Sequence, residues 1–270
     1  MSVQARFTLL GTGSSGGVPR IGNDWGACDP KEPRNRRLRC SALLDVGPAD
    51  MPERSTRILI DTAPDLREQL LRQEVQHLDA LVYTHAHADQ AHGIDDVRAL
   101  VLRMQKTIPT FMDAPTADAL VNRFEYCFQG KGGYPPILDR QPLLVPGQPF
   151  SVKGPGGPVS ILPFNQYHGR IKSLGFRIGN LAYCNDLHDF PSESFDALKG
   201  VEILILDALR YKPHPSHAHL DRALAWIEDI EPGTAWLTNL HVDMDYHTLC
   251  NELPSHVRPA YDGLCLDFTV

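Results

Sequence analysis

Short runs of apolar and β-branched residues recur along the chain, bounded by glycine, proline or polar residues, and this pattern is typical of β-strands. We expect strands at 7–10, 57–60, 80–83, 174–178, 181–184, 202–206 and 234–237. Between them, apolar residues recur every three or four positions, which predicts helices. We expect helices at 65–72, 95–102, 116–124 and 220–230. Strands interspersed with helices indicate an α/β fold.

Two connecting segments have distinctive compositions. Gly179 and Asn180 separate two expected strands, and both residue types tolerate positive φ, so we expect a tight hairpin turn there. The segment 129–158 holds seven prolines and seven glycines with little periodicity. We expect it to be a long loop, and such loops are commonly lids or binding elements.

The composition favours one domain spanning 1–270, since 270 residues with 42% hydrophobic content can bury a full core. A net charge of −7 argues against a nucleic-acid partner or an anionic-membrane surface. The N-terminal residues lack a long apolar stretch with a cleavage site, so we expect no signal peptide, and no stretch approaches the ~20 apolar residues of a membrane span. Six cysteines without C-x-x-C spacing suggest reduced thiols, so we expect a cytoplasmic protein.

One segment, 31–39, is strongly basic against this acidic background. Two interpretations stay open. The segment could be a solvated loop, as charge runs usually are, or it could form a rim that attracts a phosphate-bearing substrate.

Three histidines and an aspartate follow the expected strand at 80–83 within eight residues: His85, His87, Asp89 and His92. Neutral imidazole nitrogens and carboxylate oxygens are ligands of Zn²⁺ and similar ions. Ligands two residues apart in extended chain project to the same side. We therefore predict that this segment binds at least one metal ion.

The spacing His85-x-His87-x-Asp89 resembles the H-x-H-x-D-H signature of the metallo-β-lactamase superfamily, whose members are mostly binuclear hydrolases. The resemblance implies a four-layer αββα sandwich with the site along one edge. His168, Asp186 and His241, at other expected strand ends, resemble the superfamily's third histidine, bridging aspartate and last histidine.

By that likeness, His85, His87, His168 and Asp186 would hold a first ion. Asp89, Asp186 and His241 would hold a second. The implied cofactors are one or two divalent ions per chain, Zn or Mn.

The segment 10–19 resembles the L-G-T-G-x-x-x-G-x-P opening of the phosphodiesterase branch, close to 5-phosphoribosyl 1,2-cyclic phosphate phosphodiesterase, and the likeness spans nearly the whole chain. It implies hydrolysis of a small, cyclic phosphodiester by metal-bound hydroxide. Backbone N–H groups of Gly13, Ser14, Ser15 and Gly16 would approach phosphate oxygens. A plain strand-to-loop turn is the alternative for these glycines.

The same likeness assigns the general acid to His217, with His214 and His219 as alternatives in the same loop. Asp89 could orient the nucleophile as well as bind metal. Asp61 could accept a hydrogen bond from a ligand imidazole, or it could stabilise a turn.

The chain departs from the family pattern in two places. Gln90 stands where the signature has its last histidine, and an amide oxygen is a much poorer ligand than imidazole. Gln90 could bind weakly through oxygen, the second ion could be lost, or His92 could substitute. We expect a weakened second site. Cys28 is a single thiol where relatives often carry a cysteine cluster, so we expect no structural zinc.

Two other functions share these features. A ribonuclease Z-like nuclease would use the same ligands, although the acidic charge and the lack of a recognisable tRNA-binding arm argue against it. The protein could instead be a degenerate, non-catalytic binding protein, which would explain why Gln90 replaces the last histidine of the signature. The expected partner is a small phosphodiester. A monomer and a homodimer are both compatible with the sequence.

Overall fold

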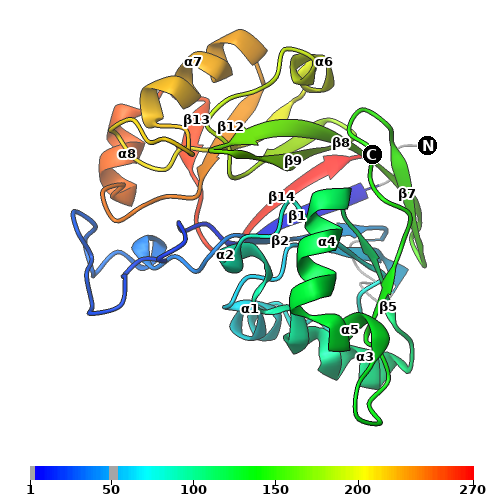
Figure 1. The fold of residues 1–270 in the computed structure, drawn as a ribbon. Coiled ribbons are helices and arrows are strands. Elements are labelled where there is room, and N and C mark those ends of the chain that lie inside the picture. The colour runs from blue at the N-terminus through cyan, green and yellow to red at the C-terminus, as the bar shows by residue number, and fades with distance from the viewer. Residues whose placement is uncertain (1–3, 49–53) are drawn as a thin grey trace.

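The computed structural model describes residues 4–48 and 54–270, and this part of the chain forms two mixed seven-stranded sheets (Figure 1). The first has the strand order β14-β1-β2-β3-β4-β5-β6. Its strands are β1 (Gln4–Gly11), β2 (Ser41–Val46), β3 (Thr56–Ile60), β4 (Ala80–Val82), β5 (Ile108–Phe111), β6 (Leu138–Arg140) and β14 (Leu264–Thr269). The second has the order β13-β12-β11-β10-β9-β8-β7. Its strands are β7 (Phe150–Gly154), β8 (Gly157–His168), β9 (Ile171–Ile178), β10 (Leu181–Cys184), β11 (Ile203–Asp207), β12 (Thr234–Thr238) and β13 (Val257–Pro259).

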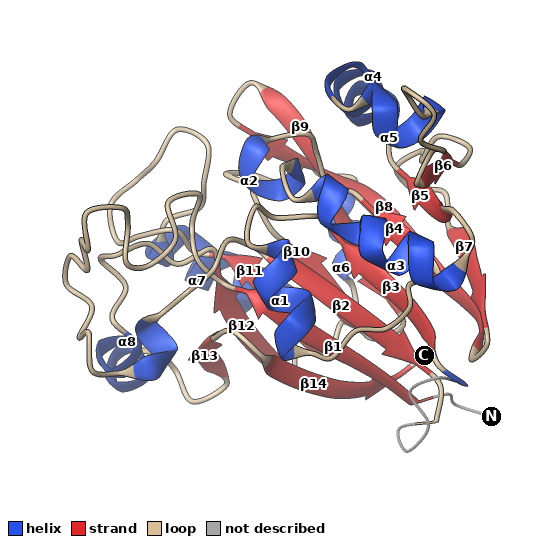
Figure 2. Cartoon of the chain, turned by 90° about the horizontal axis from the view of Figure 1, so that it is seen from below, coloured by secondary structure: helices blue, strands red, loops and turns tan. Residues whose placement is uncertain are grey.

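Helices cover the outer face of each sheet. On the first sheet lie α1 (Leu66–Arg72), α2 (Ala88–Ala91), α3 (Arg98–Met104), α4 (Ala114–Arg123) and α5 (Glu125–Gln129), several of them visible in Figure 2. On the second lie α6 (Ser194–Leu198), α7 (Leu220–Ile230) and α8 (Tyr246–Glu252). Two short 3₁₀ helices, η1 (Pro33–Asn35) and η3 (Ile94–Val97), complete the set of described helices. The four-layer αββα arrangement expected from the sequence is confirmed.

The alternation of side chains along the strands explains the layers. Ile58 and Ile60 of β3 face the core between the sheets, whereas Leu59 packs under the helices of the first sheet. Phe176 and Ile178 contribute to the same central core from the second sheet. Both faces of the central strands are therefore apolar, as expected for strands covered on both sides.

All seven expected strands and all four expected helices overlap observed elements, and the turn at Gly179, whose φ is +55°, joins β9 to β10 as an antiparallel pair. The expectation of a long loop at 129–158 is wrong in part, because it contains β6, β7 and the start of β8. Gly157, with φ +102°, allows the tight return between β7 and β8. The helix expected at 95–102 begins as η3 and continues as α3.

Several strands end with polar residues at one edge of the molecule. Asp61 follows β3, Asp186 follows β10 and Asn239 follows β12. These three residues have φ values of +61°, +56° and +60°, a left-handed conformation that is uncommon outside glycine and clusters at functional sites. None of the described helices is both long enough and apolar enough to cross a membrane.

Candidate metal centre and active site

Three histidines converge at this edge. His85 and His87 lie in the loop after β4, and His168 is the last residue of β8. Their ring centroids are 4.5, 4.9 and 5.1 Å apart, and one ring nitrogen from each lies within 4.8 Å of the others. The structure thus brings together the three imidazoles that the sequence assigned to the first ion.

Neighbouring groups fix which nitrogen of His85 is free. The Thr84 hydroxyl donates to Asp61 Oδ2 at 2.7 Å, so it accepts from His85 Nδ1–H at 3.0 Å. His85 Nε2 is buried with no hydrogen-bond partner among the described residues. The expected role of Asp61 is therefore indirect, since it orients the imidazole through Thr84.

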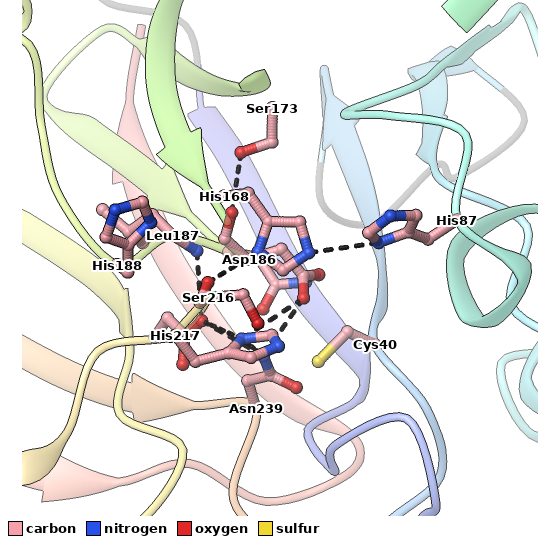
Figure 3. Close-up of polar contacts among 12 residues, drawn as sticks. Cys40, His87, His168, Ser173, Asp186, Leu187, His188, Ser216, His217 and Asn239 are labelled. Carbon is pink, nitrogen blue, oxygen red and sulfur yellow. Dashed lines mark hydrogen bonds and ion pairs between the residues drawn. The ribbon is translucent and has the colours of Figure 1, made fainter. Parts of the chain in front are cut away.

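The His168 ring is held in the same way. Its Nδ1–H donates to the carbonyl oxygen of Ser216 at 2.7 Å, which leaves the Nε2 lone pair free (Figure 3). His168 Nε2 and His87 Nδ1 are 3.1 Å apart. Two nitrogens on one tetrahedral zinc are separated by about 3.3 Å, given Zn–N bonds of about 2.0–2.1 Å.

Electrostatics keep these imidazoles neutral. Burial, with His168 and His87 nearby, holds the pKa of His85 well below its usual range. Burial also lowers the pKa of His168 to about 3 and lowers the pKa of His87. Neutral imidazoles with oriented lone pairs and an unpartnered buried nitrogen fit a divalent ion such as Zn²⁺.

Asp186 lies beside this cluster but is surrounded by amides. Its Oδ2 accepts from Asn185 Nδ2 at 2.7 Å and from Gln90 Nε2 at 2.9 Å, and Asn239 Nδ2 lies 3.3 Å from Oδ1. Ser173 donates to its backbone carbonyl at 2.7 Å (Figure 3). Burial raises the pKa of Asp186 well above its usual range, so ionisation requires a compensating positive charge.

The remaining residues assigned to the second ion are not gathered in this way. Asp89 is half-buried, with Oδ2 3.5 Å from Gln90 Nε2. His241 lies 3.2 Å from Asp243, and neither Asp89 nor His241 belongs to a compact group of three ligands within the described chain. Gln90 presents an N–H donor to Asp186 rather than its oxygen. Their metal roles therefore stay predictions. His92 is exposed, with its ring 5.7 Å from that of Phe124.

His217 is held close to Asp186 and His168. Its Nδ1 is 2.8 Å from Asp207 Oδ2. The same nitrogen is 3.6 Å from Asp186 Oδ1, and the ring centroid is 4.7 Å from that of His168 (Figure 3). Burial lowers the pKa of His217, but the charge and hydrogen bond of Asp207 outweigh it and raise the pKa to about 9. Asp207 therefore favours the protonated ring, in which Nε2–H can donate.

The other two histidines of this loop are placed differently. His214 is half-buried, its Nδ1 is 3.3 Å from the backbone nitrogen of Ser216, and its ring centroid is 5.2 Å from that of His217. His219 is the N-cap residue of α7. Of the three, His217 alone belongs to a ligand-spaced group among the described residues, together with His168 and Asp186.

The glycine turn, residues 13–16, offers fewer free backbone N–H donors than the sequence led us to expect. Gly13 N–H donates to Leu38 O at 2.8 Å and Ser14 N–H to Leu240 O at 3.2 Å, so both are occupied. A Cβ on Gly13 would lie 2.9 Å from that of Arg37, which makes Gly13 a close-packing residue. Ser15 and Gly16 are exposed at the tip of the turn and line a cavity of about 540 Å³. The phosphate contact expected from the sequence stays a prediction, and Ser15 and Gly16 are the two of the four residues that are exposed.

The basic segment 31–39 is only partly solvated. Arg37 is fully buried and donates to Asn35 Oδ1 at 3.2 Å. Arg39 pairs with Asp65 at 2.6 Å, whereas Arg36 is exposed and lines the cavity beside the glycine turn. Cys28 is buried in a small cluster with Val18 and Val242.

Four residues of the site were not predicted from the sequence: Thr84, Asp207, Asn185 and Asn239. Asp207 and Asn239 are polar residues where the runs of β11 and β12 end, the same signal that identified Asp186. Asn239 Nδ2 lies 3.2 Å from Asp207 Oδ2 and 3.3 Å from Asp186 Oδ1, so it bridges the two carboxylates. Only the three-dimensional arrangement reveals this contact.

Known proteins resemble this chain at the levels of sequence and fold. The family model described as beta-lactamase superfamily domain matches residues 56–239. The crystal structure of a diphosphatase from the PhnP family aligns with 100% of this chain and 99% of its own, with 34% identity and a TM-score of 0.88. Zn²⁺-bound PqqB from Methylobacterium extorquens shares the fold, with a TM-score of 0.72 and 16% identity over 97% of this chain and 100% of its own.

A curated octanoyltransferase of Porphyromonas gingivalis is 33% identical over 263 residues, 96% of this chain and 51% of that protein. The chain thus spans about half the length of the curated relative it matches. The family match covers the described site from β3 to Asn239, including all three clustered histidines. The chain therefore belongs to the metallo-β-lactamase superfamily of metal-dependent hydrolases and, within it, to the PhnP-like branch.

Proposed function

We propose that this protein is a metal-dependent phosphodiesterase that hydrolyses a small phosphodiester. The observation that carries the proposal is the pairing of a three-imidazole cluster with a histidine that a buried carboxylate, Asp207, orients. His85, His87 and His168 would hold a divalent ion, and His217 lies in ring contact with His168. A metal centre and a proton donor on one edge are the two components that diester hydrolysis requires.

A divalent ion held by these residues would acidify a water molecule and offset charge on the phosphoryl oxygens. In the reaction, a water oxygen joins phosphorus and the bond to one ester oxygen breaks. That oxygen leaves as an alkoxide and needs a proton.

His217 would supply this proton from Nε2. Asp207 holds Nδ1–H at 2.8 Å and favours the protonated ring, which leaves Nε2 for the leaving oxygen. Leu187 N–H at 3.1 Å and the Asn239 amide fix Asp207 in turn. After the alkoxide departs, a proton from the attacking water restores His217.

One ion per chain is the occupancy that the contacts favour. Gln90 directs an N–H at Asp186, the carboxylate that a second ion would share, and His241 is turned towards Asp243. The same N–H would stabilise the Asp186 carboxylate beside the first ion.

The test is hydrolysis of a panel of phosphodiesters by protein loaded with Zn²⁺ or Mn²⁺. We expect turnover of bis(p-nitrophenyl) phosphate and of a ribose cyclic phosphate, lost in His85→Ala and His168→Ala. Cleavage of a tRNA precursor together with a tRNA gel shift would instead indicate a nuclease. Metal binding without turnover of any diester would indicate a non-catalytic protein.

A further inference from the structure

A large cavity opens beside two of the clustered histidines. It has a volume of about 750 Å³, and its lining includes His85, His87 and Asn165. Volumes of about 300–1,000 Å³ are usual for small-molecule sites. Two of the three clustered histidines therefore lie at the wall of a cavity large enough for an organic group.

Most of the remaining wall is apolar. It is formed by one face of α4, the segment after β6 and the start of β9, through Pro115, Ala119, Leu144, Val145 and Ile171. Val145 is 48% exposed and Ile171 is 42% exposed, although each is a large apolar side chain. Exposed apolar groups that line a concave site are a typical sign of a ligand-binding surface.

Two positively charged side chains, Arg123 and Lys172, also line the cavity. Arg123 donates to the carbonyl oxygen of Ala86, the residue between His85 and His87, at 2.5 Å. Lys172 also lines the cavity, with Nζ 6.0 Å from the ring of Tyr167. The carboxylate of Asp113, which lines the cavity too, accepts from Thr116 N–H at 3.0 Å as the N-cap of α4.

We infer that this cavity binds the apolar substituent of an organic phosphate ester, with the phosphate at the histidines and Arg123 and Lys172 beside it. The inference rests on the proposed function, because the site is the same one. It adds the substrate class: a phosphodiester that carries an alkyl or aromatic group. Each methylene that leaves water for the cavity should tighten binding up to about fourfold, from about 0.8 kcal/mol per buried CH₂.

The test is isothermal titration calorimetry of the metal-loaded protein with methyl, butyl and octyl phosphate. We expect Kd to fall at least 30-fold from methyl to octyl phosphate. In Ala119→Phe, a new ring fills the cavity from α4. The ratio of the Kd for methyl phosphate to the Kd for octyl phosphate should then fall below threefold. Asn122→Phe adds the same ring to an exposed position of α4 outside the lining and should keep the wild-type ratio.

Val145→Asp is a second probe that places a charge on the exposed wall without adding bulk, and it should also reduce the ratio. Circular dichroism confirms folding of each variant. Equal Kd values for the three esters in the wild type, or an unchanged ratio in both cavity variants, would overturn the inference.

The two proposals fail separately. If the protein hydrolyses p-nitrophenyl methyl phosphate but binds the three esters equally, the phosphodiesterase stands and the apolar subsite is wrong. If binding depends on chain length and the cavity variants remove that dependence, but no diester is cleaved, the subsite stands and the proposed activity is wrong.

Discussion

The side-chain amide of Gln90 donates a hydrogen bond of 2.9 Å to Oδ2 of Asp186. This contact places an N–H where a second metal ligand would face its ion, and Asn185 donates to the same oxygen at 2.7 Å. Gln90 Oε1 is buried without a hydrogen-bond partner among the described residues, so the only metal ligand that position 90 could offer is this weak amide oxygen. The contact therefore favours one ion in this site.

Gln90→His should open the second site. An imidazole nitrogen is a far better ligand for a borderline ion than an amide, and the hydrogen bond to Asp186 is lost. We expect the metal content to rise from about one ion per chain towards two, with an increase in diesterase rate. Elemental mass spectrometry measures the content. Gln141→His, at a half-buried position outside both ligand-spaced groups of the described residues, controls for adventitious binding by the added ring. An equal gain in both variants would refute the prediction.

His217→Gln should slow the cleavage of esters with poor leaving groups. A positioned acid typically contributes 10²–10⁴-fold when the departing oxygen needs a proton. We expect a loss of about 100-fold or more for a diester that releases an alcohol, and a much smaller loss for one that releases p-nitrophenolate. His219→Gln is the matched control from the same loop. Equal losses for both leaving groups would show that His217 does not act as the acid.

Thr84→Val should weaken metal binding without removing a ligand. The substitution preserves shape but deletes the hydroxyl that links His85 Nδ1 to Asp61. Loss of such an orienting partner typically costs 10–100-fold in metal affinity. Competition with a chromophoric chelator measures this affinity. Thr110→Val, a buried threonine in β5, should leave it unchanged, and an equal loss there would point to a general effect on stability.

Asp245→Ala should destabilise the fold in a pH-dependent way. Asp245 is the N-cap of α8 and also accepts from Asp29 N–H and from Asn35 Nδ2. Burial raises the pKa of Asp245, but hydrogen bonds from Thr248, Asp29 and Asn35 lower it to about 2. The free energy of unfolding should fall by about 1–3 kcal/mol at pH 7.

Because the pKa in the folded state is depressed, this contribution is present above about pH 4 and is lost as the pH falls towards 2. Urea unfolding of wild type and variant should therefore show a difference that shrinks from pH 5 downwards. Asp196→Ala, on the surface of α6, should have little effect at either pH. A difference that stays constant with pH would contradict the assigned role.

The sequence anticipates the three-histidine cluster because His85 and His87 follow the apolar strand β4 and His168 ends β8, although these strands belong to different sheets. His85, His87 and His168 could be found in this way. Which amide atom of Gln90 faces Asp186 could not be predicted. An amide presents either an oxygen or an N–H, and only the positions of Asp186 and Asn185 decide between them. The strands β6 and β7 were missed because glycine and proline in 129–158 obscure the period-two pattern.

The most direct measurement is the metal content, by elemental mass spectrometry, of wild type and His168→Ala purified without chelator or affinity histidines. We predict close to one divalent ion per wild-type chain and almost none in His168→Ala, because removing one of three converging imidazoles leaves too few ligands. A wild-type chain without metal, or a His168→Ala chain that keeps its full metal content, would contradict the three-histidine centre. Two ions in the wild type would contradict a second site closed by Gln90.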